Sequence, residues 1–387
     1  MMKERTLRVL EFTKIRDRLA SKAMTDMGRE RCEALVPSSN MTEIQRMQAE
    51  TEEATVILQY VGASPLVPFS DVRASLTLAE KGATLSPKAL LEVAALMQSA
   101  RAARKALDTE RDNTPILKEL AQRLSTLHNV EQDITNAIIS EDEIADRASN
   151  ELMDIRRHLR GANERIKEKL NQMIRSSAFQ KYLQDPIVTM RNDRYCLPVK
   201  AEYRGSVPGL VHDQSSTGAT LFIEPMAAVE MGNELKTWAA KEKQEIERIL
   251  AALSAEIAPY ADQLRETVET LAELDYIFAK GMLSREMNAV SPKLNQNGYI
   301  NIIRGRHPLI DREKVVPSNL WMGKDFTSLI ITGPNTGGKT VTLKTVGLLT
   351  LMAQAGLQVP ADLGTELAVF EPVSYTHLRA HETDSYL

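Results

Sequence analysis

Hydrophobic positions in residues 1–130 recur every three or four residues, which is typical of amphipathic helices. Leu7, Leu10 and Ile15 form the first such stripe. Clusters of proline, glycine and serine separate this stripe from the later ones and mark loops. No catalytic motif occurs in this part of the chain. We therefore predict a helical core domain over residues 1–130.

Two longer helical patterns follow, and each predicts a lever helix. The first lies in residues 131–178, where a stripe from Ile134 to Arg175 predicts one rod about 60 Å long at about 1.5 Å per residue. The second lies in residues 226–296, and Pro259 predicts a kink within it. Because both helices flank a single insertion, we expect them to pair antiparallel with the insertion at their far end.

The insertion, residues 179–225, has a different pattern. Short runs of β-type residues between turn residues predict a small β-containing clamp. These runs are Ile187–Met190, Tyr195–Val199 and Thr220–Ile223. Basic residues also gather here, and a phosphate backbone can be bound by Lys and Arg alone. The residues that we predict to contact nucleic acid are Arg191, Arg194, Lys200 and Arg204. Acidic neighbours dilute this patch, so solvated helix and turn charges are the alternative interpretation.

Residues 328–340 combine a hydrophobic run, a glycine-rich turn and the start of a helix. Ser328–Thr332 predicts a short buried strand, and a helix is predicted to begin near Thr340. The turn Gly333–Thr340 has the spacing Gly-x4-Gly-Lys-Thr of a phosphate-binding loop. Glycines let the N–H groups of such a loop face a phosphate, and the helix adds the positive end of its dipole.

We therefore predict a nucleotide site that binds ATP and Mg²⁺. The expected binding residues are Gly333, Pro334, Asn335, Thr336, Gly337, Gly338, Lys339 and Thr340. Lys339 would reach the β- and γ-phosphates and the Thr340 hydroxyl would ligate Mg²⁺, so these two residues are the predicted catalytic ones. The alternative is a glycine-rich turn that has this spacing by chance.

The segment before the loop is less informative. Tyr299–Ile303 predicts a strand. His307 precedes a proline and, taken alone, is most simply a loop residue satisfied by backbone groups. Val315 and Val316 can be core strand residues. The residues by themselves assign no chemistry to these three positions.

Composition narrows the class of protein. A net charge of −4 and a pI near 6.0 exclude a global basic field, so any nucleic-acid contact needs a local patch. The two cysteines, Cys32 and Cys196, lie far apart, which argues against a disulfide scaffold or a zinc site and favours a reducing compartment. Because no apolar run is long enough to span a bilayer, we expect a cytoplasmic protein without a membrane partner.

Several motifs together resemble the MutS superfamily of ATPases. The phosphate loop is preceded by Arg306–Pro308 and followed by Gln358–Asp362. A central block from Arg191 to Pro225, and the opening Thr6–Ile15, are similar to the second bacterial branch of that superfamily. The resemblance extends from residue 1 to about residue 370.

This resemblance implies a fold and a set of ligands. The expected fold is multidomain and mainly α, with a helical core and antiparallel levers that carry the clamp. An incomplete α/β P-loop domain of ABC type would follow over residues 297–372. The resemblance also implies that Val315 and Val316 pack on the adenine and that His307 belongs to the same nucleotide site. Ser318 stands where relatives often carry Asn, so no ligand contact is assigned to it.

Proteins of this branch are described as homodimers that share nucleotide sites between their ATPase heads. They bind branched DNA, suppress homologous recombination and separate the subunits of collided ribosomes. They usually carry a C-terminal Smr-type nuclease domain. The resemblance thus implies an ATPase and endonuclease parent whose partners are DNA, ribosomal RNA or both.

Residues 373–387 resemble no continuation of the family, and we interpret them as a non-native tail after a truncation or frame shift. In the family, the acidic strand that positions water, the signature loop and the nuclease follow this point. We therefore expect this chain to bind ATP without efficient hydrolysis. Two alternatives are a structural ATPase of the cohesin or condensin type and a non-catalytic module that binds DNA or rRNA. In proteins of the cohesin or condensin type, the long helices leave from within the ATPase halves. In this chain both predicted lever helices precede the phosphate loop, which argues against that alternative.

Overall fold

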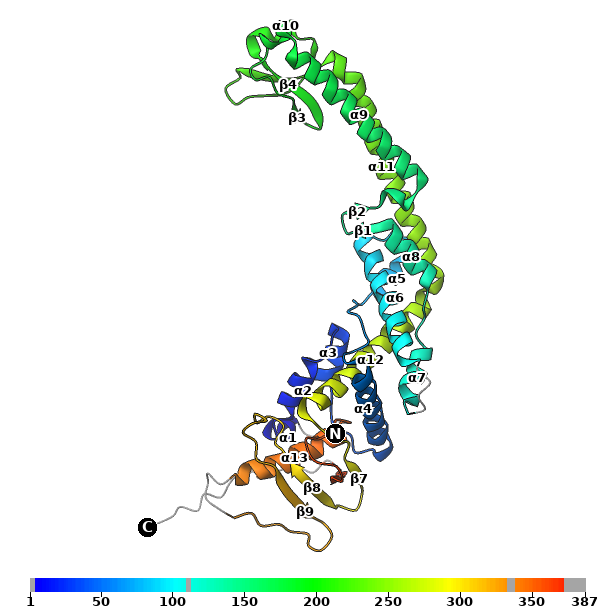
Figure 1. The fold of residues 1–387 in the computed structure, drawn as a ribbon, viewed down its shortest axis with the longest axis vertical. Helices are drawn as coiled ribbons and strands as arrows, with labels where there is room; N and C mark the ends of the chain where they lie inside the picture. Colours follow the sequence, from blue (N-terminus) through cyan, green and yellow to red (C-terminus); the bar gives the residue numbers. More distant parts are fainter. Residues whose placement is uncertain (1–3, 109–112, 333–337, 372–387) are drawn as a thin grey trace, which may run out of the picture. The chain divides into compact units, whose positions relative to one another are not determined.

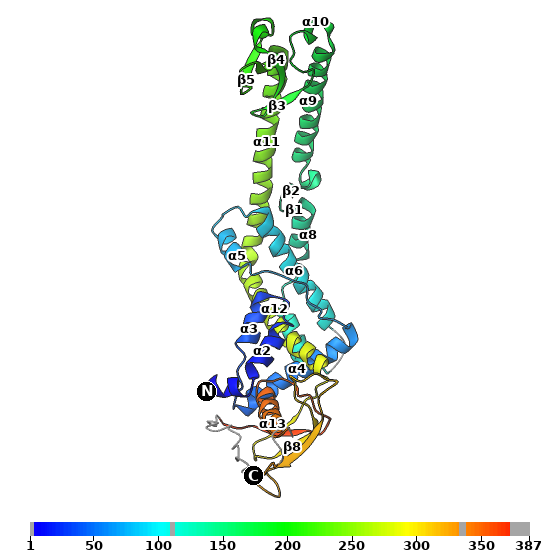
Figure 2. The same ribbon diagram turned by 90° about the vertical axis from the view of Figure 1, so that its left-hand side faces the viewer.

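The computed structural model describes residues 4–108, 113–332 and 338–371. The chain divides into a core unit (residues 1–76, 92–128 and 260–387) and an arm unit (residues 77–91 and 129–259). Both units are rich in helices and contain small sheets, as predicted for a multidomain, mainly α protein (Figures 1 and 2). Among the described helices, none has the length and apolar character needed to cross a membrane.

The helices of the first 137 residues confirm the helical pattern. They are α1 (Glu4–Val9), α2 (Phe12–Ala20), α3 (Asp26–Glu33), α4 (Met41–Val61), α5 (Arg73–Glu80), α6 (Pro87–Leu107), α7 (Pro115–Gln122) and α8 (His128–Ala137). The stripe of α2 buries Phe12, Ile15 and Leu19. The side chain of Asn40 begins α4 by accepting hydrogen bonds from two backbone N–H groups of its first turn.

Helix α12 (Ala261–Met287) is buried on most of its surface in the core unit. Gly281 allows α12 to approach α4 closely, because a Cβ there would lie 3.0 Å from side-chain atoms of both Ala54 and Leu58. The core unit also contains α13 (Lys339–Gln354), which begins where the helix after the glycine-rich turn was predicted.

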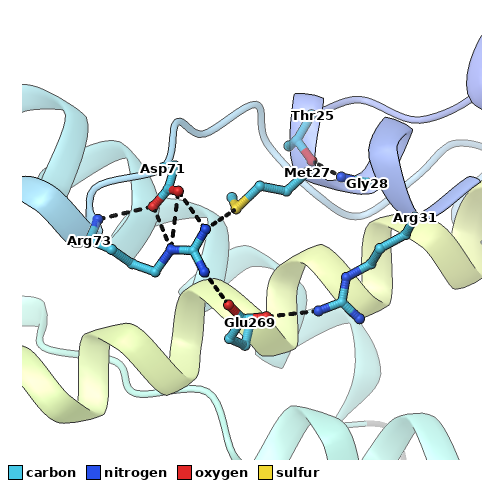
Figure 3. A network of polar contacts seen from close by, with 7 residues as sticks. All are labelled: Thr25, Met27, Gly28, Arg31, Asp71, Arg73 and Glu269. Atoms are coloured by element: carbon cyan, nitrogen blue, oxygen red, sulfur yellow. Dashed lines mark hydrogen bonds and ion pairs between the residues drawn. The ribbon is translucent and has the colours of Figure 1, made fainter. Parts of the chain in front are cut away.

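Carboxylates on α12 connect it to the N-terminal helices. Asp275 is fully buried and accepts hydrogen bonds from the N–H and the hydroxyl of Thr25, at 2.8 and 2.6 Å. Nearer the N-terminal end of α12, Glu269 forms ion pairs with Arg31 at 2.8 Å and with Arg73 at 2.5 Å (Figure 3). These contacts fix α12 against α3 and the start of α5.

The sheet of the core unit has four strands in the order β7-β10-β8-β9. They are β7 (Lys293–Asn295), β8 (Ile300–Gly305), β9 (Ser318–Met322) and β10 (Glu366–Ala368). Strand β8 confirms the strand predicted at Tyr299–Ile303, whereas β9 was not predicted. Among the described strands of this sheet, only β10 and β7 pair in parallel, so the sheet is mixed.

The prediction of a buried strand at Ser328–Thr332 is wrong. These residues form no strand, and Ile330 is 85% exposed. An apolar strand is buried only when strands flank it and helices cover its two faces. No described strand pairs with this segment, so its hydrophobic pattern has nothing to pack against.

The arm unit begins differently from the prediction. One helix from Ile134 to Arg175 was expected, but β1 (Ile138–Ser140), β2 (Glu143–Ile144) and the 3₁₀ turn η1 (Asp146–Ala148) interrupt it. Two β-branched isoleucines favour the strand β1. Helix α9 (Asn150–Arg175) then begins afresh, because the Ser149 hydroxyl accepts a hydrogen bond from the Leu152 N–H at 2.9 Å.

Helix α9 pairs antiparallel with α11 (Met226–Ile257), as predicted (Figures 1 and 2). Arg156 forms an ion pair with Glu242 at 2.7 Å, and Arg165 with Glu234 at 2.9 Å, so the partner number falls as the α9 number rises. The predicted kink at Pro259 is the 3₁₀ turn η3 (Ala258–Tyr260). The expected single lever over residues 226–296 is therefore divided, with α11 in the arm unit and α12 in the core unit.

The clamp, residues 179–225, contains the predicted β structure. Its sheet has the order β3-β4-β6-β5 and is antiparallel throughout. The elements here are α10 (Ser177–Gln180), β3 (Thr189–Arg191), β4 (Arg194–Lys200), η2 (Ala201–Ser206), β5 (Gly209–Gln214) and β6 (Thr220–Pro225). Strand β5 was not predicted, because its residues do not show the alternation of apolar and polar positions that is typical of a strand. Leu197 and Ile223 pack with Ile166 of α9 in the clamp core.

Candidate functional site

A cavity of about 520 Å³ lies in the core unit, between β8, the loop before β9 and the first turns of α13. Val315, Val316 and His307, which the sequence analysis assigns to a nucleotide site, all line it together with Gly338. Its volume falls within the range of about 300–1,000 Å³ that is common for small-molecule sites. The structure thus brings together residues that lie more than 20 positions apart in the chain.

The wall of this cavity is mostly apolar, and Lys314, Ser318, Thr342 and Thr345 add polar groups to it. Its apolar part is formed mainly by Ile302, Ile310, Leu320, Val341 and Val346. Val316 is 79% exposed and belongs to no strand, so it is not the core strand residue that the pattern also allowed. An apolar wall beside a polar end suits a planar heterocycle joined to a charged group.

The polar end is the N-terminus of α13. Gly338 has φ 79°, a left-handed conformation that glycine adopts without steric cost, and the helix begins at the next residue. Lys339 and Thr340 form its first turn, although neither lines the cavity itself. The first N–H groups of a helix have no partner within it and attract anions. Residues Gly333, Pro334, Asn335, Thr336 and Gly337 lie outside the described residues.

His307 was expected either to be a loop residue satisfied by backbone groups or to belong to the nucleotide site, and its position is compatible with both. Its ring is buried and its Nδ1 accepts a hydrogen bond from the Leu309 N–H at 3.3 Å, so a backbone group does satisfy it. It also lines the cavity. Burial lowers the pKa of His307, with Glu11 opposing the shift, and the imidazole is therefore neutral at pH 7. A neutral ring places no positive charge in the wall.

Glu11 is a residue near this site that the sequence analysis missed. It lies between α1 and α2 with φ 60°, uncommon for a residue other than glycine, and its carboxylate accepts from Lys14 at 2.5 Å and from Lys344 of α13 at 3.0 Å. Hydrogen bonds from these two lysines hold its pKa at about 2. No pattern could have found it, because 333 positions separate Glu11 from Lys344.

No group of three metal-binding side chains occurs among the described residues. A magnesium ion held by one threonine hydroxyl and by phosphate oxygens needs no such group. The assignment of Mg²⁺ to Thr340 is therefore compatible with the structure and stays a prediction.

In the clamp, three of the four predicted nucleic-acid contacts are engaged within the protein. Arg194 forms an ion pair with the fully buried Glu224 at 3.1 Å. Arg191 forms one with Asp213 at 3.2 Å, and Arg204 donates to the carbonyl oxygen of Gly209 at 3.1 Å. Lys200, at the end of β4, has no ion pair with any described residue. Three of the four predicted contact residues are thus bound to groups within the clamp, and Lys200 is the one whose ammonium group forms no ion pair with a described residue.

Comparison with known proteins identifies the family. A model described as MutS domain V matches residues 329–384. A protein called Endonuclease MutS2 from Alkaliphilus oremlandii is 52% identical over 374 residues, which are 96% of this chain and 47% of that protein. Proteins of the same name from Acetivibrio thermocellus and Geobacillus sp. are 49% and 48% identical over 377 and 375 residues. Each of these two alignments covers 96% of this chain, and 47% and 48% of the respective relative.

The chain belongs to the MutS-like family. The resemblance found in its motifs is thereby confirmed. This MutS-like chain spans about half the length of the curated relatives it matches. The domain V match extends into residues 373–384, which the sequence analysis interprets as non-native. Those residues lie outside the described part of the chain, and their origin stays a prediction.

Proposed function

We propose that this MutS-like chain binds ATP with Mg²⁺ in the cavity at the start of α13. Val315 and Val316 pack against the adenine there. The first N–H groups of α13 and the ammonium group of Lys339 bind the phosphates, and Thr340 contributes a magnesium ligand. The metal, when bound, offsets the negative charge of the phosphates. The observation that carries this proposal is the shared cavity of Val315, Val316 and Gly338.

We further propose that nucleotide binding shifts α13 and that this shift is passed on to the levers. The C-terminal end of α13 is held by α4, because Gln48 Nε2 donates to the carbonyl oxygens of Ala353 and Leu357, both at 2.9 Å. Thr51 of α4 donates to the carbonyl oxygen of Gly356 at 2.7 Å. Helix α4 packs in turn on α12, which continues the chain from the lever α11. A shift of α13 therefore acts on the root of the lever.

For the whole protein we propose the activity that the name Endonuclease MutS2 gives its relatives, driven by ATP binding and hydrolysis in a homodimer. Its nucleic-acid partner is branched DNA, in the suppression of recombination, or the RNA of collided ribosomes. The clamp contacts either partner through basic side chains, which bind a phosphate backbone without reading its sequence.

Equilibrium titration of the full chain with MgATP tests the site. Lys339→Ala is expected to weaken binding at least tenfold, and Val316→Asp is expected to weaken it without affecting folding, because Val316 is 79% exposed. Lys324→Ala, which removes an exposed lysine of the core unit outside the cavity, is the control. Unchanged affinity in both site variants would refute the proposal, as would an equal loss in the control.

A second titration tests the coupling. Nucleic-acid binding by the wild-type chain is expected to change when ATP is added, whereas the Lys339→Ala variant is expected to bind equally well with and without ATP. Its affinity in the absence of nucleotide should equal that of the wild type. An ATP effect that persists in the variant would contradict the transmission from α13.

A further inference from the structure

Three aromatic rings meet at the end of the arm unit where α9 gives way to the clamp. They belong to Phe179 of α10, Tyr182 of the following loop and Tyr203 of η2. The rings of Phe179 and Tyr182 meet edge to face with centroids 5.9 Å apart, and those of Tyr182 and Tyr203 are tilted with centroids 5.3 Å apart. All three residues are half-buried, so each packs on the clamp core and still reaches solvent.

Two lysines accompany this aromatic cluster. Lys181 Nζ lies 4.9 Å from the centre of the Tyr182 ring. The backbone N–H of Lys200 donates to the carbonyl oxygen of Tyr182 at 3.0 Å, which fixes the end of β4 beside the rings. Neither ammonium group forms an ion pair with a described residue. These lysines therefore differ from Arg191 and Arg194, whose guanidinium groups are paired with carboxylates.

Aromatic faces and unpaired cations are the two features that bind unstacked nucleotides. A base outside a duplex can stack on a tyrosine or phenylalanine ring, and its phosphate can be bound by a nearby lysine. The bases of an intact duplex are already stacked, and such a duplex offers mainly phosphates to a protein. Asp185 and Glu202, which are exposed and close in sequence to Tyr182 and Tyr203, add negative charge that weakens the attraction of this region for phosphates. Stacking then provides a larger share of the binding energy.

We propose that Phe179, Lys181, Tyr182, Lys200 and Tyr203 bind unpaired bases of a nucleic acid, such as those at a branch point or in a loop. This inference rests on the proposed contact between the clamp and nucleic acid and names the feature that the clamp recognises. The rings discriminate unpaired from paired bases, and the two lysines hold the backbone beside them. Because stacking ignores the 2′-hydroxyl, the same cluster accepts DNA and RNA.

Fluorescence anisotropy with the full chain tests this inference. The labelled probes are a single-stranded DNA, an RNA of the same sequence, a blunt duplex and a forked duplex. The wild type is expected to bind the single strands and the fork more tightly than the blunt duplex. Tyr182→Ala combined with Tyr203→Ala is expected to weaken binding of the single strands and the fork about tenfold or more, and to leave the duplex affinity nearly unchanged.

Three further variants separate stacking from folding and from charge. Tyr182→Phe keeps the ring and should bind as the wild type does. Lys181→Ala with Lys200→Ala should weaken every probe and reduce the dependence on salt. Tyr60→Ala, which removes an exposed tyrosine of α4, is the matched control and should change nothing. Circular dichroism of each variant verifies the fold.

Two results would overturn the inference. One is a wild type that binds the blunt duplex as tightly as the fork and the single strands. The other is a double tyrosine variant that is folded and keeps wild-type affinity for single strands of both DNA and RNA. In either case, duplex binding that still responds to ATP would leave the proposed function standing, so the two failures can be told apart.

Discussion

Replacing Lys280 by methionine should stabilise the core unit. Lys280 lies on α12 with its side chain fully buried, and its ammonium group has no hydrogen-bond partner in the described structure. The nearest carboxylate oxygen, on Glu50, is 3.7 Å away, and the ring centre of Tyr276 is 4.6 Å away. Burial lowers the pKa of Lys280 from 10.5 to about 8. Keeping this group charged at pH 7 therefore costs about 3 kcal/mol.

Methionine keeps most of the buried chain and removes the charge. Some of the gain is lost with the attraction of Glu50 and the contact with Tyr276, so we expect a net increase in unfolding free energy of about 1–3 kcal/mol at pH 7. Glu50 is not left alone, because Arg46 remains 3.0 Å from it. The sign of the pH dependence follows from the pKa. Between pH 8 and 10.5 the unfolded wild-type chain binds more protons than the folded one, so the wild type gains stability as the pH rises. The difference in unfolding free energy between the variant and the wild type therefore shrinks.

Urea unfolding followed by tryptophan fluorescence measures this difference. The chain has two tryptophans, Trp238 in the arm unit and Trp321 in the core unit. A Trp238→Phe background leaves Trp321 as the reporter of the unit that contains Lys280. Lys324→Met, at an exposed lysine of the same unit, is the control and should not be stabilised. A Lys280→Met variant that unfolds at lower urea than its parent at pH 7, or a difference that is equal at pH 7 and pH 10, would refute the reasoning.

Two other perturbations give clear expectations in the same assay. Gly28→Ala should destabilise the core unit by about 2–4 kcal/mol, because the new Cβ would lie 2.2 Å from Asp275 Oδ2 and must displace the buried carboxylate that holds Thr25; wild-type stability would contradict this packing. Glu11→Gln should lower stability by about 1–2 kcal/mol above pH 5 and by almost nothing near pH 2, because the depressed pKa of Glu11 contributes stability that is lost as the pH falls from 4.5 toward 2. A pH-independent difference would contradict the role of the carboxylate.

The helices of the core unit could be predicted because their hydrophobic periodicity coincides with their packing. The stripe of α2 contains Phe12, Ile15 and Leu19, and all three are buried. The antiparallel pairing of α9 with α11 followed from topology alone, since two long helices that flank one insertion have few other ways to bury their stripes. The interruption before α9 could not be predicted in this way, because a short hairpin there keeps the apolar spacing that suggested one continuous helix.

The residues of the candidate site were predictable in parts. The spacing around Lys339 located the start of α13, and the family resemblance added Val315, Val316 and His307. Glu11 was not predictable, because its importance arises from a left-handed backbone and a partner 333 positions away. The strand expected at Ser328–Thr332 shows the limit of local pattern. A run of hydrophobic residues predicts a buried strand, but the strand is buried only where neighbouring strands and helices cover it.

The basic residues of the clamp show why counting charges is a weak guide to a binding surface. Arg191, Arg194 and Arg204 raise the local charge as much as any lysine does, yet the fold uses them to hold Asp213, Glu224 and a backbone carbonyl. A cation already paired with a buried carboxylate must lose that partner to bind a phosphate, and the unpaired carboxylate would then bear a desolvation cost. A cation without a carboxylate partner would bind a phosphate at less cost. Among the described residues of the clamp, Lys181 and Lys200 beside the aromatic cluster form no ion pair, although Lys181 lies over the Tyr182 ring.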